Sequence, residues 1–201
     1  MILAGIVSIG VAYLLGSICS AILVCRLLGK PDPRTQGSRN PGATNVLRCG
    51  GRFAACLTLI GDFTKGWLPV IVAQSIKLPP VYIGCIMLAA LLGHLYPLYF
   101  GFKGGKGVAT MLGVIYGLNL ELGLLATATW VAIAMIFRYV SLASLVMVVL
   151  LPCYAYWLQL HSYCITLAML AGLVGYAHRK NIYRLWQGQE PKLGKIQGSK
   201  K

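Results

Sequence analysis

Long apolar stretches separated by polar connections dominate this chain, and five of them are evident at once. They span residues 2–28, 53–76, 80–100, 141–158 and 161–177. Each is close to the length of about 20 residues that an α-helix needs to cross the hydrocarbon core of a membrane. The region 107–137 is too long for one crossing and short for two, but Asn119 and Glu121 interrupt it as a turn. We therefore expect two further helices there, over residues 107–118 and 120–137.

The positions of the basic residues decide between six and seven spans. With seven spans and Met1 outside, Lys65 and Lys77 are the exceptions among 18 basic residues, and the other 16 flank the inner ends of the helices. Basic residues accumulate on the cytoplasmic side of membrane proteins. A six-helix arrangement would place Arg138 and the basic tail on the opposite side from residues 34–52. The sequence thus predicts an all-α polytopic membrane protein with seven transmembrane helices, a periplasmic N-terminus and a cytoplasmic C-terminus.

Composition supports this assignment. The chain is 58% hydrophobic and only 11% charged, with a mean hydropathy of +0.74, whereas soluble domains carry about 25% charged residues. Its 201 residues leave room for a single integral-membrane domain, residues 1–201. The net charge of +14 is explained by membrane orientation, so no nucleic-acid partner is expected. The seven cysteines are scattered without a CxxC pair, which indicates neither disulfides nor a zinc site. We interpret the first apolar segment as a retained helix and not a cleaved signal peptide.

The connections predicted to lie inside carry three polar clusters. The first, GSRNPGATNVLR (residues 37–48), combines glycines that let backbone N–H groups converge on an anion with an arginine, Arg48, that can grip phosphate oxygens. The alternative is a structural loop whose basic residues hold lipid headgroups. Nucleotide hydrolysis is not indicated, because Ala43 stands where a nucleotide-binding loop requires lysine.

The second cluster, GFKGGKGVAT (residues 101–110), places glycines and Lys106 before a helix N-terminus, where free N–H groups favour an anion; a membrane-anchoring turn is the alternative. In the third, HRKNIYRLWQGQE (residues 178–190), His178, Asn181 and Arg184 share one face if the last helix continues past Ala177. The alternative is an amphipathic interfacial segment with Trp186 at the headgroups.

Several polar residues stand outside these clusters. Asp62 and Lys65, one helical turn apart, are expected to form a structural ion pair. His94 and His161 lie in apolar segments and receive no role. Ser141 is expected to cap the helix that it begins, with a phosphate contact by Ser141 or Ser144 left open.

Together the three clusters closely resemble the motifs of the bacterial acyl-phosphate:glycerol-3-phosphate acyltransferases, the PlsY family, in order and spacing. The resemblance implies transfer of a fatty acyl group from acyl phosphate to the sn-1 hydroxyl of glycerol 3-phosphate at the cytoplasmic face of a bacterial inner membrane. Lysophosphatidic acid and phosphate would be the products, in the first step of phospholipid synthesis. By motif, Ser38 and Arg48 correspond to catalytic residues and Glu190 to an organiser of the inner loops. The predicted phosphate-binding residues are Gly42, Ala43, Thr44, Asn45, Lys103, Gly104, Gly105, Lys106, Ser141, His178 and Asn181. Arg39 stands where the family often has glycine, and its role is open.

The residues also bear on mechanism. Glycerolipid acyltransferases commonly use a histidine with an aspartate five positions later, but here the residues five beyond the histidines are Tyr99, Thr166 and Tyr183. A reactive acyl phosphate allows substrate-assisted proton transfer instead, with acylation of Ser38 as the alternative. No carboxylate cluster indicates a metal, and no cofactor is expected. The expected partners are acyl phosphate, glycerol 3-phosphate and membrane lipid, and we expect a monomer. An organic-phosphate transporter and a non-catalytic lipid-binding scaffold are the rival functions.

Overall fold

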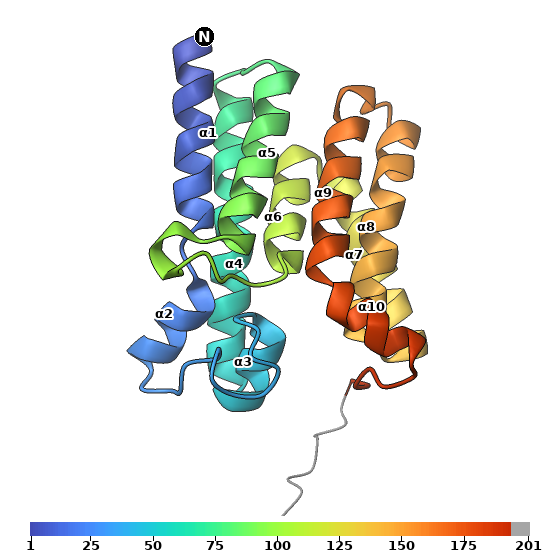
Figure 1. Ribbon diagram of the computed structural model, residues 1–201. Coiled ribbons are helices and arrows are strands. Elements are labelled where there is room, and N and C mark those ends of the chain that lie inside the picture. Colours follow the sequence, from blue (N-terminus) through green and yellow to red (C-terminus); the bar gives the residue numbers. More distant parts are fainter. Residues whose placement is uncertain (194–201) are drawn as a thin grey trace, which may run out of the picture. The chain divides into compact units, whose positions relative to one another are not determined.

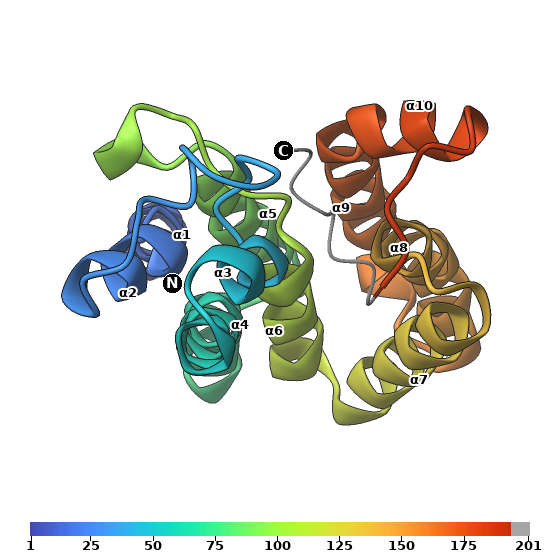
Figure 2. The same cartoon turned by 90° about the horizontal axis from the view of Figure 1, so that it is seen from below.

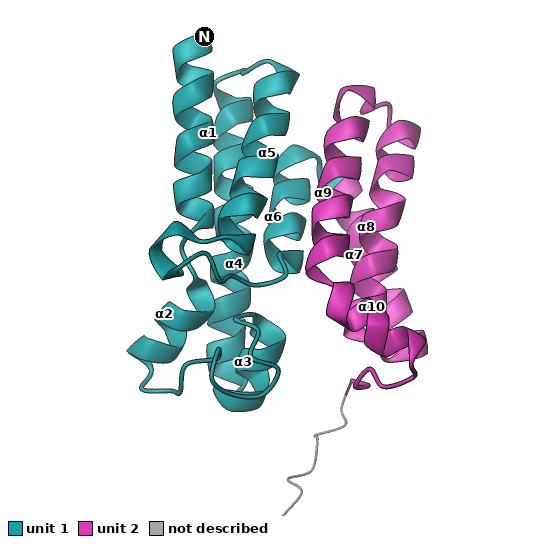
Figure 3. Ribbon diagram, viewed as in Figure 1, with its two compact units in different colours: residues 1–121 teal, residues 122–201 magenta. Residues whose placement is uncertain are grey.

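The computed structural model describes residues 1–193, and all regular secondary structure in this range is helical (Figure 1). The all-α prediction is therefore confirmed. The chain divides into two compact units, residues 1–121 and 122–201 (Figure 3). The first unit contains α1 (Ile2–Gly16), α2 (Ser20–Leu27), α3 (Ala43–Cys49), α4 (Arg52–Ser75), α5 (Pro80–Leu95), the 3-10 helix η1 (Leu98–Phe100) and α6 (Val108–Leu118). The second contains nearly all of α7 (Leu120–Phe137), then α8 (Val140–Trp157), η2 (His161–Tyr163), α9 (Cys164–Ala177) and α10 (Arg179–Trp186).

The described residues include four helical segments that are long and apolar enough to cross a membrane, or five if the bent pair α1 and α2 counts as one span. The four are α4, α5 with η1, α7 and α8. Two shorter apolar helices, α6 and the segment His161–Ala177, match the remaining predicted spans. Each predicted segment thus has a helical counterpart. The number of crossings and the sidedness of the termini stay predictions; of the basic residues used for them, Lys195, Lys200 and Lys201 lie outside the described residues.

The first apolar segment is not the single helix that we expected. It breaks between Gly16 and Ser20, and the two parts are bent by 45°. Two contacts with residues distant in sequence accompany the break. Gly16 lies directly against the backbone of Ala90, and the Ile18 carbonyl accepts a 2.6 Å hydrogen bond from Lys65 Nζ on α4. A side-chain donor thus satisfies a carbonyl near the break, which allows an interruption in an apolar segment.

The predicted interruption at Asn119 is confirmed. Asn119 is extended, with φ −157° and ψ 130°, and separates α6 from α7. With 11 residues, α6 rises about 16 Å, roughly half the thickness of a hydrocarbon core. Within the first unit, the main chain of Thr110 lies against Gly66. Thr110 is the third residue of α6, whereas Gly66 lies fourteen positions after the start of α4. The glycine-rich turn before α6 is therefore recessed along α4.

The long helix α4 organises the first unit, since it contacts α1, α2, α3, α5 and α6. Its approach to α6 is close because Gly66 faces the main chain of Thr110 and Gly113 faces that of Phe63. Small residues commonly allow such close helix packing in membranes. At its other end α4 supports α3: Val46 of α3 is fully buried in a cluster with residues of α2 and with Ala54. This cluster fixes the short helix that carries the second half of the first motif.

In the second unit α8 packs along α9, and α10 contacts both. His178 separates α9 from α10, so the last apolar helix does not run unbroken past Ala177; α10 turns across the end of α9 (Figure 2). The change of direction brings the third motif against the start of α8.

Candidate active site

The first motif is a loop held together by Asn45. The Asn45 side chain accepts a hydrogen bond from the Ser38 N–H (2.9 Å) and donates to the carbonyls of Pro33 (2.7 Å) and Gln36 (3.1 Å). Only 2% of Asn45 is exposed. An amide with all these backbone partners shapes the loop, and it would have to leave them to contact a phosphate.

The side chains of Ser38 and Arg48, in contrast, are exposed to solvent. Arg48 lies in the last turn of α3, and Ser38 precedes Arg39, whose φ of +58° is left-handed. This backbone region favours glycine, so Arg39 adopts it at a conformational cost. Within the described residues, no imidazole or carboxylate forms a hydrogen bond with the Ser38 hydroxyl.

The ion pair between Asp32 and Arg34 lies at the beginning of the same loop, with 2.7 Å between Arg34 Nη2 and Asp32 Oδ2. Hydrogen bonds from the Arg34 side chain and backbone hold the pKa of Asp32 below its usual value. About a third of each side chain is exposed, so the pair contributes little to stability.

The second motif forms a tight turn against the end of α5. The N–H groups of Gly104 and Gly105 donate to the carbonyls of Leu95 (3.1 Å) and His94 (3.3 Å). A side chain at Gly104 would overlap the His94 carbonyl, and one at Gly105 would overlap the imidazole and approach the Pro41 carbonyl to 2.9 Å. Glycine is thus required at both positions because the turn lies in direct contact with His94. Because Pro41 belongs to the first motif, the first two motifs meet in the first unit.

The aspartate and lysine of α4 form the expected ion pair, with 2.9 Å between Lys65 Nζ and Asp62 Oδ1. The structure adds His94, which sequence reasoning left without a role: its Nδ1 lies 3.6 Å from Asp62 Oδ1 and 3.1 Å from Thr110 Oγ1. These four side chains are buried. A histidine–aspartate contact therefore exists, although the two residues are 32 positions apart.

Glu190 is the centre of the third motif. Its Oε1 accepts hydrogen bonds from Ser141 Oγ and Asn181 Nδ2, both at 2.6 Å, and its Oε2 accepts from Arg184 Nε at 2.7 Å. Burial alone would raise the pKa of Glu190, but these three donors hold it below its ordinary value. Asn181 and Arg184 do share one face, as predicted, and this face is directed to Glu190.

His178 is buried at the junction of α9 and α10, where its Nδ1 lies 2.8 Å from the Val174 carbonyl. Because a carbonyl only accepts, Nδ1 must carry the proton. This contact fixes the ring at the start of the third motif.

The expectation that Ser141 caps a helix is wrong. α8 begins one residue earlier, at Val140, and Tyr139 occupies the cap position without a side-chain bond. Ser141 therefore lies inside the first turn and donates to Glu190. Ser144 donates to the Val140 carbonyl and accepts from Trp130 Nε1 (3.1 Å). Of the two serines, Ser141 is thus the one that contacts the third motif within the described residues.

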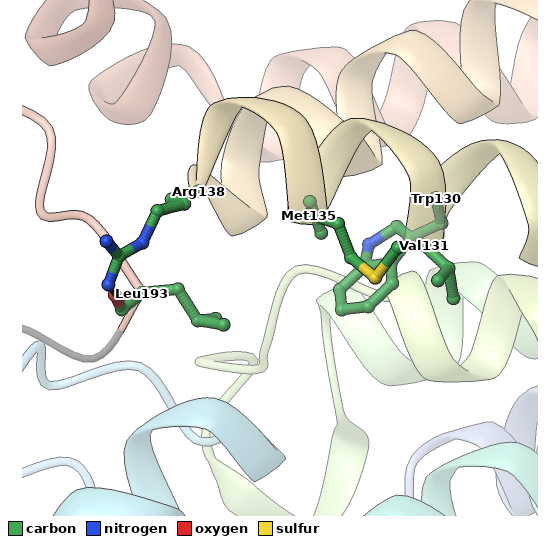
Figure 4. Close-up of a pocket in the computed structure, with 6 residues that line it drawn as sticks. Trp130, Val131, Met135, Arg138 and Leu193 are labelled. Atoms are coloured by element: carbon green, nitrogen blue, oxygen red, sulfur yellow. Dashed lines mark hydrogen bonds between the residues drawn. The ribbon is translucent and has the colours of Figure 1, made fainter.

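The second unit also has an open apolar pocket of about 340 Å³ lined by residues of α7, by Arg138 and by Leu193. Figure 4 shows Trp130, Val131 and Met135 along the helix and the Arg138 guanidinium directed to Leu193, whose carbonyl accepts its 3.2 Å hydrogen bond. None of the predicted site residues lines it. The pocket is therefore separate from the motifs.

Known proteins are similar to this chain in sequence and in fold. The family profile described as "Glycerol-3-phosphate acyltransferase" matches residues 6–188. The chain belongs to this family. Glycerol-3-phosphate acyltransferases of Thioalkalivibrio sulfidiphilus and Vibrio vulnificus are 54% identical over 195 residues and 52% identical over 184, covering 96% and 92% of this chain and 96% and 90% of theirs.

Two solved structures of PlsY, described as an integral membrane glycerol 3-phosphate acyltransferase, are also similar. Its glycerol 3-phosphate form has 37% sequence identity and a TM-score of 0.90, and its "lysphosphatidic acid" form has 35% and 0.87. Both comparisons cover 95% of this chain and 96% of the other. The acyltransferase family places this chain among integral membrane enzymes of phospholipid synthesis, and the transporter and scaffold hypotheses are set aside. The individual site residues of this acyltransferase stay predictions.

Proposed function

We propose that this acyltransferase takes its acyl group from acyl phosphate and transfers it to the sn-1 hydroxyl of glycerol 3-phosphate, giving lysophosphatidic acid and inorganic phosphate. The observation that carries the proposal is the similarity, over 95% of the chain, to an enzyme solved in a glycerol 3-phosphate form. The agreement of all three motifs with the PlsY pattern supports the acyl-phosphate donor.

The chemistry needs no cofactor. The sn-1 oxygen attacks the acyl carbonyl carbon, and the bond from that carbon to the phosphate oxygen breaks, so phosphate leaves with the electron pair. A phosphate oxygen of one substrate accepts the hydroxyl proton. Acyl phosphate is a mixed anhydride with a good leaving group, so orientation and charge stabilisation suffice. Ser38 is disfavoured as a covalent nucleophile because no base among residues 1–193 forms a hydrogen bond with its hydroxyl.

The residues divide into two roles. Arg48 and the Ser38 hydroxyl, both exposed on the first motif, stabilise the departing phosphate together with the backbone at Gly42, Ala43 and Thr44. In the first unit, Lys106 and the turn at Lys103, Gly104 and Gly105 bind glycerol 3-phosphate. In the second unit, His178 and Asn181 of the third motif are the proposed phosphate-binding residues. Asn45 and Glu190 act by shaping these loops. The Ser141 hydroxyl donates to Glu190 in the absence of substrate and to phosphate when substrate is bound.

A reconstituted assay tests the proposal. Purified protein given palmitoyl phosphate and glycerol 3-phosphate should release one phosphate for each lysophosphatidic acid formed. Palmitoyl thioesters of coenzyme A or of acyl carrier protein should give no product, and neither should a deoxy analogue of glycerol 3-phosphate that lacks the sn-1 hydroxyl. Equal rates with a thioester donor would contradict the proposed donor.

We further propose that the whole chain is one multi-pass domain of a bacterial inner membrane, with seven spans, a periplasmic N-terminus and all three motifs on the cytoplasmic side. The family profile covers both compact units, and the sidedness of the basic residues supports the orientation. The 11-residue α6 counts as a span whose inner end is a recessed loop.

Cysteine labelling should report this orientation. In a cysteine-free background, Gln36→Cys and Gln187→Cys should react with a membrane-impermeant maleimide only in inside-out vesicles, and Glu121→Cys only in spheroplasts. All three positions are exposed in the structure, so a lack of reaction reports sidedness and not burial. Labelling of Gln36→Cys and Gln187→Cys from opposite sides would contradict the proposed arrangement.

A further inference from the structure

The buried polar cluster of the first unit consists of Asp62, Lys65, His94 and Thr110. It joins three helices: Asp62 and Lys65 come from α4, His94 from α5 and Thr110 from α6. The side chains of Asp62, Lys65 and His94 are 3%, 6% and 5% exposed. Charged groups are costly within apolar membrane helices and commonly have a function there. The ion pair offsets part of that cost, but a well-packed apolar pair would avoid it.

His94 connects this cluster to the glycine-rich turn. Its carbonyl accepts the Gly105 N–H (3.3 Å), and its imidazole Nε2 lies where a side chain at Gly105 would project. The opposite ring nitrogen, Nδ1, contacts Thr110 Oγ1 and Asp62 Oδ1. One residue thus touches the turn through both its main chain and its ring, while the far side of the ring is held by α4 and α6.

Lys65 anchors the other end of the cluster. It lies 2.9 Å from Asp62 Oδ1 and donates to the Ile18 carbonyl at the break of the first apolar segment. The Asp62 carboxylate is therefore paired with a lysine that is itself held outside the turn. Its Oδ1 lies 3.6 Å from Nδ1 of the imidazole against which Gly105 packs.

We propose that Asp62, His94 and Thr110 are positioning residues that hold the glycine-rich turn in the conformation that binds the phosphate of glycerol 3-phosphate. This inference rests on the proposed function, which assigns that turn to glycerol 3-phosphate. His94 does not act as a general base, because its Nε2 is covered by Gly105 and the residue is 5% exposed. Its contribution is to the binding geometry, where displacements of a fraction of an ångström weaken several hydrogen bonds to an anion at once.

The kinetic signature of positioning is specific. His94→Leu should raise the KM for glycerol 3-phosphate about tenfold, with kcat lowered less than about threefold and the KM for palmitoyl phosphate within about twofold. Misfolding would instead lower the active fraction and hence kcat at an unchanged KM. A general base would give a large loss of kcat.

Two near-isosteric variants distinguish an effect on the glycine-rich turn from the effect of removing any buried hydroxyl. Thr110→Val removes the hydroxyl that meets His94 Nδ1 and should raise the KM for glycerol 3-phosphate about threefold. Thr58→Val is the matched control: Thr58 is likewise fully buried, but among the described residues its hydroxyl bonds only the Ala54 carbonyl within α4. This control should leave both KM values unchanged. If His94→Leu cannot be purified, the Thr110→Val and Thr58→Val pair decides the question.

Gly105→Ala distinguishes failure of this inference from failure of the proposed function. An alanine there meets the imidazole and the Pro41 carbonyl, so it should raise the KM for glycerol 3-phosphate about tenfold or more. If Gly105→Ala leaves that KM unchanged, the turn is not the glycerol 3-phosphate site and the proposed function is wrong in this respect. If Gly105→Ala raises it while the His94 and Thr110 variants do not, only the positioning role is overturned.

Discussion

Arg48→Ala is expected to lower kcat about a thousandfold, because removal of one group that stabilises developing negative charge typically costs 10²- to 10³-fold in rate. Arg48 is exposed in the last turn of α3, whereas the helix is fixed to the first unit by the buried Val46. The substitution should therefore leave the fold intact. Steady-state phosphate release at saturating concentrations of both substrates measures the effect.

Two further variants make this result specific. Arg48→Lys keeps the charge but loses the planar fork of donors, so its kcat should fall between those of Arg48→Ala and the unaltered enzyme. Arg52→Ala is the matched control, since Arg52 is exposed at the start of α4 only four positions away. It removes the same charge and should change kcat less than about threefold. Equal losses in Arg48→Ala and Arg52→Ala would mean that only the general positive potential matters.

Mass spectrometry tests the role of Ser38. In the proposed mechanism the Ser38 hydroxyl donates to the departing phosphate, and no acyl-enzyme accumulates. Mass spectrometry of enzyme quenched after mixing with palmitoyl phosphate should show no mass increase of a palmitoyl group. A palmitoyl adduct on Ser38 would establish the covalent route instead.

The sequence predicted where helices lie better than how they bend. Apolar runs and Asn119 located the helices because burial in lipid requires continuous apolar surface. The break near Ile18 was missed, because it depends on a hydrogen bond from Lys65, 47 residues away in sequence. The turn at His178 was missed for a related reason: the buried Asn181 and its partner Glu190 favour a new helix direction that no local pattern reveals.

The motifs indicated which loops matter but not the task of each side chain. Asn45 and Ser141 were grouped with phosphate ligands, and the structure shows them bound to backbone carbonyls and to Glu190. His94 received no role because its partners, Asp62 and Thr110, come from two other helices. The usable signal was that polar residues lie within three apolar segments, Asp62 and Lys65 in one, His94 in the second and Thr110 in the third, since polar residues in membrane helices commonly pair with one another.

Glu190 is the acceptor on which the third motif depends, and its removal should have the second large effect. The side chain is 7% exposed, and it accepts from two nearly buried donors, Ser141 and Asn181. Depriving buried donors of an acceptor costs about 1–3 kcal/mol each. Arg184 is 39% exposed, so water replaces much of its contact. We therefore expect Glu190→Ala to destabilise the packing of α10 on α8 by about 2–6 kcal/mol.

Glu190→Gln tests the same point without changing size. A glutamine presents one oxygen and one NH₂ group, so whichever way it is turned, a donor faces either Arg184 or the pair Ser141 and Asn181. The variant should lower the Tm in detergent by about 5 °C or more and reduce phosphate release at least tenfold, through displacement of His178 and Asn181. Tryptophan fluorescence on heating and the steady-state assay measure the two effects.

The pH dependence gives an independent check with a definite sign. Because the pKa of Glu190 lies below its ordinary value, the ionised side chain stabilises the fold above about pH 4.3, and this contribution is lost as the pH falls through the lowered pKa. The Tm difference between the unaltered enzyme and Glu190→Gln should therefore be constant near neutrality and shrink below pH 4.

Asp32→Asn is the control, since the Asp32 carboxylate pairs with Arg34 and about a third of each side chain is exposed. This substitution should shift the Tm by less than about 2 °C. Both variants change a carboxylate to an amide, one in a buried site and one in an exposed site. If Glu190→Gln is no less stable than Asp32→Asn at pH 7, the three hydrogen bonds to Glu190 do not hold the third motif.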